Sequence, residues 1–173
     1  MTTESIITLL SWAAPVCFGL HIIEELFWPG GFREWYHSYR PQVSGAPMSY
    51  YYKANVCYFA AVLTVPFSRH PAYGTLFVAG VLFYNLLFTH IRGALKTRSY
   101  SPGIVTGLLL YVPFFVASYG YLISKHAVSI PEALVCAVLS LGGEIYFALK
   151  KVTPKAGSVS TGSVSNQSPA LEV

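Results

Sequence analysis

The sequence predicts an all-α protein, a polytopic bundle of about five membrane-spanning helices, and three observations favour this class. First, 54% of the residues are hydrophobic and only 10% are charged, whereas soluble domains carry about 25% charged residues. Second, the apolar residues come in runs that approach the roughly 20 residues needed to cross a bilayer. Third, backbone groups in hydrocarbon must pair within their own segment, so each run is expected to be a helix.

Turn residues and polar segments divide the chain into five apolar runs. The second run is short, and we expect its helix to begin earlier, in the aromatic stretch around Tyr50 and Tyr52. The runs form a single bundle over residues 1–153, followed by a polar, repetitive tail (154–173) that is expected to be disordered. The predicted spans are residues 6–27, 54–67, 72–91, 103–124 and 130–149.

The basic residues predict how the bundle lies in the membrane. With five spans, Arg69 and Lys125 fall on one side, and the other nine lysines and arginines fall on the opposite side. The positive-inside rule then places the N-terminus outside and the C-terminus in the cytoplasm. These basic residues are spread along a membrane face, so we expect contact with membrane lipid and no nucleic-acid partner.

The connection between the first two spans, residues 30–52, is unusually long. It is rich in tyrosine, tryptophan and arginine, a composition typical of the lipid headgroup layer. We predict that it forms a lid over one end of the bundle, with Gly30 and Gly31 as its hinge.

Polar side chains gather in the cytoplasmic half of the predicted bundle. The first span ends with His21, Glu24 and Glu25, and the third carries Asn85 and His90. Glu24 and Glu25 are three and four residues after His21, so both carboxylates flank the imidazole on a helix. Charged groups at mid-bilayer cost about 2.5–3.5 kcal/mol and usually face the bundle interior. We therefore predict an intramembrane polar pocket with these five residues as its catalytic core.

Four further residues lie at the same predicted depth and are assigned to the surroundings of this pocket. Asn55 is in the second span and Thr106 is in the fourth, close to Tyr100. Glu144 in the fifth span is an additional candidate. Asn55 and Thr106 are expected to be structural rather than reactive.

The residues His21-Ile22-Ile23-Glu24-Glu25 resemble the signature of the HXXEE family of small integral-membrane proteins. The spacing of Asn85 and His90 and the segment Tyr100-Ser101-Pro102-Gly103 with Thr106 are also similar to that family. The resemblance covers about residues 15–113. It implies a shared polar site and names no reaction.

The preferred hypothesis is an enzyme that acts on a lipophilic small molecule by acid–base chemistry. A carboxylic acid in apolar surroundings holds its proton at neutral pH and can donate it, and an adjacent histidine can accept one. Aromatic walls would stabilise a developing cation. Isomerisation, cyclisation and the opening of an epoxide or ester all fit this set of residues, and none of them requires a cofactor.

Two alternatives remain open. A divalent metal, zinc or non-haem iron, could be bound by His21, by Glu25 or Glu24, and by His90, with Glu144 as an additional candidate ligand. The site could instead be non-enzymatic, either a proton or cation relay or a polar lock between helices. A relay is less favoured because the outer half of the bundle offers few ionisable groups.

Overall fold

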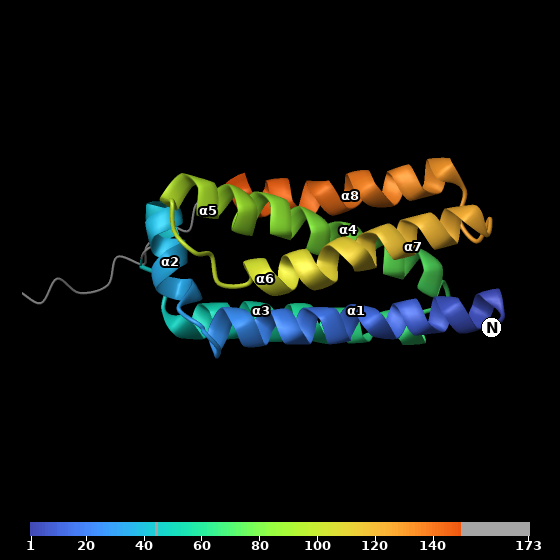
Figure 1. Ribbon diagram of the computed structural model, residues 1–173, viewed down its shortest axis with the longest axis horizontal. Coiled ribbons are helices and arrows are strands. Elements are labelled where there is room, and N and C mark those ends of the chain that lie inside the picture. Colours follow the sequence, from blue (N-terminus) through green and yellow to red (C-terminus); the bar gives the residue numbers. More distant parts are fainter. Residues whose placement is uncertain (44, 150–173) are drawn as a thin grey trace, which may run out of the picture.

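The computed structural model describes residues 1–43 and 45–149, apart from the side chains at 144 and 147–149. Within these residues the chain is helical and contains no strand, which confirms the predicted all-α class. The long helices lie side by side along the long axis of the molecule (Figure 1). They are α1 (Thr3–Leu26), α3 (Met48–Leu63), α4 (Pro71–Asn85), α7 (Val112–Ser124) and α8 (Ile130–Leu149). The predicted tail, 154–173, lies outside the described residues.

Two of these helices continue through π-helical segments into short helices. α4 runs through η3 (Leu86–Ile91) into α5 (Arg92–Thr97), and α6 (Ile104–Thr106) runs through η4 (Gly107–Tyr111) into α7. In such segments the backbone hydrogen bonds join residues five apart, and they are frequent at functional sites. His90 lies in η3, so its angular position relative to Asn85 differs from that in an ideal α-helix.

The predicted spans correspond to helices, and three of the helices are long and apolar enough to cross a membrane. These three cover Thr3–Leu26, Pro71–Thr97 and Ile104–Ser124, and a shorter apolar stretch follows at Ile130–Gly143. Their outer faces carry exposed aliphatic side chains such as Val16, Leu109 and Val116. Exposed apolar surface of this extent is typical of a protein in lipid. The chain therefore has the character of a membrane protein.

The core is built where α1, α4 and α7 meet. Ala14 and Phe18 of α1 pack with Val78 and Leu82 of α4 and with Phe114 of α7. Buried apolar packing of this kind fixes the relative height of the helices. It therefore sets which polar residues of α1 and η3 can meet.

The long connection after α1 folds into α2 (Phe32–Tyr39) and the turn η1 (Pro41–Val43), which lie across one end of the bundle (Figure 1). Trp35 is buried against α5 and its Nε1 donates a hydrogen bond to Thr97. The Tyr39 hydroxyl donates to the carbonyl of Phe88. The connection is thus packed against the end of the bundle, and the hinge motion predicted for Gly30 and Gly31 stays a prediction.

Gly93 permits this packing, and its replacement by alanine is expected to loosen α2. A Cβ at Gly93 would lie 2.5 and 2.6 Å from ring carbons of Trp35, closer than side chains tolerate without a shift. We expect tryptophan fluorescence to move to longer wavelength and protease cleavage within α2 to accelerate. The control is Gly120→Ala, since a Cβ there meets nothing within 4 Å. Equal behaviour of the two variants would contradict the docking.

Candidate active site

His21 and Glu25 face each other one helical turn apart near the end of α1. His21 is 1% exposed and Glu25 is 5% exposed. The His21 Nε2 lies 3.3 Å from the Glu25 Oε1. The i, i+4 spacing of the sequence accounts for this contact.

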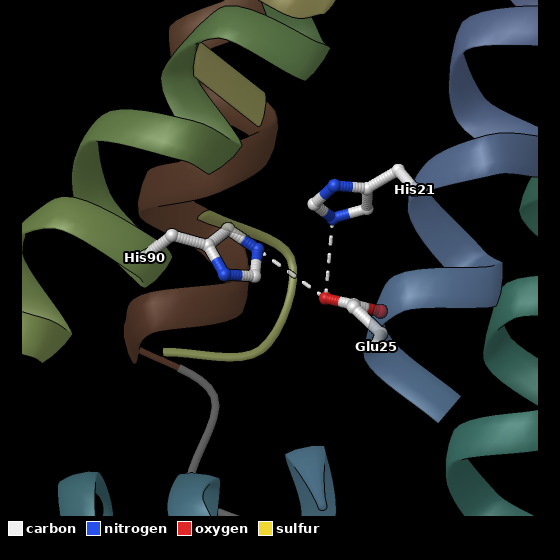
Figure 2. A group of neighbouring side chains, drawn as sticks. All are labelled: His21, Glu25 and His90. Carbon is white, nitrogen blue, oxygen red and sulfur yellow. Dashed lines mark ion pairs between the residues drawn. The ribbon is translucent and has the colours of Figure 1, made fainter. Parts of the chain in front are cut away.

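His90, which belongs to η3, completes the cluster with His21 and Glu25 of α1. It is fully buried in η3, and its Nε2 lies 3.2 Å from the same oxygen, Oε1 of Glu25 (Figure 2). The two imidazoles meet edge to face, with centroids 4.8 Å apart. The ring of Trp35 is stacked parallel to the His90 imidazole, with the two ring centroids 6.1 Å apart. His21, Glu25 and His90 are called the triad below.

A hydroxyl group holds the outer nitrogen of each imidazole. His21 Nδ1 is 3.0 Å from the Thr106 Oγ1, and His90 Nδ1 is 3.0 Å from the Ser101 Oγ. Thr106 donates its own proton to Glu24, so its oxygen accepts from His21. Nδ1 of His21 therefore carries a proton, and in the neutral ring Nε2 presents a lone pair to the chamber.

Glu24 points away from the triad and holds the start of α6. It is 6% exposed, and its two oxygens accept hydrogen bonds from the Tyr100 hydroxyl, the Val105 and Thr106 amides and the Thr106 hydroxyl. Four donors suit an ionised carboxylate, which has about four acceptor positions. Partial burial and then the bond to Glu24 raise the pKa of Tyr100, which keeps it a donor. Glu24 thus orients Thr106 and, through it, His21.

The turn Ser101-Pro102-Gly103 is packed directly against the triad. Gly103 has φ +96°, and a Cβ there would lie 2.6 and 2.7 Å from the Cε1 atoms of His21 and His90 and 3.0 Å from Glu25. Only glycine combines this backbone angle with this approach. The turn closes one side of the chamber.

A cavity of about 200 Å³ opens beside the triad between α1, α3, α4 and the α2 segment. His21 and Glu25 border it, whereas His90 is not among its lining residues. Six phenylalanine and tyrosine side chains contribute to its walls, together with amide side chains and one arginine. The lining includes Phe18, Phe32, Tyr36, Tyr50, Tyr51, Tyr58, Asn55, Asn85 and Arg40.

The structure brings together most of the residues predicted from the sequence, in different roles. His21, Glu25 and His90 converge, while Asn55 and Asn85 line the cavity. Asn85, the last residue of α4, donates a long hydrogen bond of 3.5 Å from its Nδ2 to the Thr89 Oγ1 of η3. Tyr100 and Thr106 hold Glu24 instead of lining the cavity. The side chain of Glu144 lies outside the part of the chain that the structure describes.

Some site residues were not predicted. Gly103 and Ser101 lie in the Ser-Pro-Gly segment that the sequence singles out, but nothing local shows that they face two histidines. Tyr111 is fully buried with its ring centroid 4.6 Å from that of His21, and its hydroxyl has no hydrogen-bond partner among the residues that the structure describes. No polar pattern marks it, because it sits among leucines in η4.

A family model described as a protein of unknown function with an HXXEE motif matches residues 12–118, more than half of the chain. The chain belongs to the HXXEE family. The lettered positions of the motif are His21, Glu24 and Glu25, and the match also includes His90 and the turn at Gly103. α8 lies outside the match. No curated protein and no solved structure matches the chain.

Proposed function

We propose that this HXXEE protein is an integral-membrane enzyme that acts on a lipophilic small molecule. One observation carries the proposal: a cavity with aromatic walls has Glu25 and His21 on its border, inside an apolar helical bundle. Binding sites for small molecules are typically concave and apolar with a few convergent polar groups. A lipophilic molecule can enter such a cavity directly from the membrane.

The proposed arrangement has five spans, with α3 and α8 crossing beside the three longer helices. Arg33, Arg40 and Arg92 belong to the end of the bundle at α2 and α5, and Arg69 and Lys125 belong to the opposite end (Figure 1). The positive-inside rule favours the cytoplasm for the α2 end and the outside for the N-terminus. The triad then lies toward the inner leaflet.

The proposed chemistry is proton transfer at the cavity border. His21 Nε2 is directed inward, because Thr106 holds Nδ1, so the imidazole can accept a proton from a bound molecule. Glu25 lies 3.3 Å from that nitrogen and stabilises the imidazolium that forms. The tyrosine and phenylalanine faces of the wall suit a cationic intermediate. Isomerisation, cyclisation and epoxide or ester opening are the reactions that these groups support.

Conversion of a membrane-derived compound tests the proposal. Purified protein in lipid discs is incubated with the apolar extract of the cells that produced it, and masses and chromatographic retention are compared before and after. We expect at least one compound to be consumed and one to appear. Ala54→Trp fills the cavity from an exposed position on α3 and should abolish the change.

Ala60→Trp is the matched control, because Ala60 is exposed on the same helix and is not among the cavity-lining residues. It should convert the compound like the unsubstituted protein. An extract that is unchanged by the unsubstituted protein, or conversion that Ala54→Trp leaves intact, would refute an enzymatic role of this cavity.

A further inference from the structure

The triad has the composition of a metal site as well as that of an acid–base pair. We infer that His21 Nε2, His90 Nε2 and a Glu25 carboxylate oxygen bind a divalent transition-metal ion. Two imidazoles and one carboxylate with an open position are the ligand set of catalytic zinc and of non-haem iron(II). The binding of the ion does not depend on the proposed function. With the ion bound, His21 Nε2 coordinates it and does not accept a proton, so the proton transfer proposed above belongs to the metal-free protein.

The distances between the ligand atoms fit an ion. In a tetrahedral site with bonds of about 2.0–2.1 Å, neighbouring ligand atoms lie roughly 3.3–3.4 Å apart. The Glu25 Oε1 lies 3.3 Å from one Nε2 and 3.2 Å from the other. All three ligand atoms lie within 4.8 Å of one another. Both contacts to the Glu25 oxygen already have this length, and an ion on all three atoms requires the two Nε2 atoms to approach each other by up to about 1.5 Å.

Both imidazoles are prepared to act as ligands. Each Nδ1 is held by a hydroxyl, Thr106 for His21 and Ser101 for His90, which is the outer hydrogen bond that orients metal-binding histidines. Each Nε2 is fully buried and has no hydrogen-bond partner of good geometry, although both are within ion-pair distance of Glu25. Two buried nitrogens that converge on one carboxylate oxygen form a set of three donor atoms that can share a cation.

The charges of the site also favour a divalent ion. Glu24 and Glu25 are both buried, and within residues 1–43 and 45–149 neither forms an ion pair with a lysine or arginine. Two buried carboxylates without compensating charge are costly. One divalent cation on the triad balances both charges, since Glu24 is joined to His21 through Thr106.

The open side of the proposed site faces the cavity. His21 and Glu25 border the cavity, and the third ligand, His90, lies behind them against Trp35. Gly103 closes the opposite approach, because even a Cβ would touch all three ligand residues. A polar atom of the lipophilic molecule, or a water, is thus the natural fourth ligand.

The metal content of the purified protein tests this inference and requires no knowledge of the substrate. The full-length protein is purified in detergent, loaded with Zn²⁺ or with Fe²⁺ under anaerobic conditions and desalted. The bound metal per chain is then measured by elemental mass spectrometry. We expect about one ion per chain. His90→Gln should lower the content at least tenfold, because one of three protein ligands is lost.

Two further variants keep the result interpretable if His90→Gln misfolds. Ser101→Ala removes the hydroxyl that orients His90 and should weaken metal affinity by roughly 10- to 100-fold. His70→Gln, at an exposed histidine before α4, should bind metal like the unsubstituted protein. Co²⁺ in the site should show the visible absorption of a tetrahedral complex in the unsubstituted protein and in His70→Gln.

Folded, unsubstituted protein that retains neither ion overturns the metal site, as does equal metal content in Ser101→Ala, His90→Gln and His70→Gln. Such a failure is distinct from failure of the enzymatic proposal. A metal-free protein can still convert an apolar compound, and a metal-loaded protein can fail to do so.

Discussion

Gly103→Ala is expected to destabilise the protein by about 2–5 kcal/mol and to abolish the site. Its φ of +96° is strained for any residue with a side chain, and the added methyl group would lie 2.6 and 2.7 Å from the two histidines and 3.0 Å from Glu25. All three neighbours are buried, so they have little room to withdraw. The measurement is thermal or denaturant unfolding of the detergent-solubilised protein.

Gly31→Ala separates backbone strain from steric overlap. Gly31 has a similar φ, +83°, but a Cβ there meets nothing within 4 Å. It should cost only the strain, about 1–3 kcal/mol, and leave the triad in place. Equal destabilisation by the two alanines would mean that Gly103 does not press against the triad.

The two glutamates of the motif are expected to respond oppositely to glutamine. Glu24→Gln should destabilise the protein by about 2–4 kcal/mol. The substitution replaces one carboxylate oxygen, a hydrogen-bond acceptor, by an amide nitrogen, which is itself a donor and cannot accept from the neighbouring donors. The Tyr100 and Thr106 hydroxyls and two backbone amides would then compete for a single oxygen. α6 should lose its anchor, and with it the position of Thr106 beside His21.

Glu25→Gln should leave stability unchanged or slightly increase it in the metal-free protein. It removes a buried charge that lacks well-formed hydrogen bonds, and the new amide can donate to a neutral imidazole nitrogen. Unfolding curves of the two variants, recorded side by side with Glu4→Gln at an exposed position of α1, test this contrast. A greater loss of stability in Glu25→Gln than in Glu24→Gln would reverse the assigned roles.

The helices and the contact between two of the three triad residues could be predicted from local sequence. Long apolar runs give helices in lipid, and the i, i+4 spacing alone brings His21 and Glu25 together. The order of the spans also predicts that His90 lies at the same depth as His21 and Glu25. In the structure His90 approaches the same oxygen of Glu25 as His21 does, so polar residues from separate helices lie in one buried cluster.

The rest depends on contacts between distant segments. The π-helical turn around His90 has no signature in the letters Leu86–Ile91, since the same residues suit an ordinary α-helix. Equally, Glu24 and Glu25 are neighbours in sequence with the same chemistry. Only the position of Thr106, 82 residues later, turns one of them away from the chamber.

The central claim is that His21 and Glu25 act together in proton transfer with a lipophilic molecule in the adjacent cavity: His21 accepts the proton and Glu25 stabilises the imidazolium. The most direct test compares binding and conversion of the consumed compound by the unsubstituted protein and by Glu25→Gln. We expect Glu25→Gln to bind the compound with similar affinity and to convert it about 10²- to 10⁴-fold more slowly. Conversion at the original rate by a folded Glu25→Gln protein would contradict the claim.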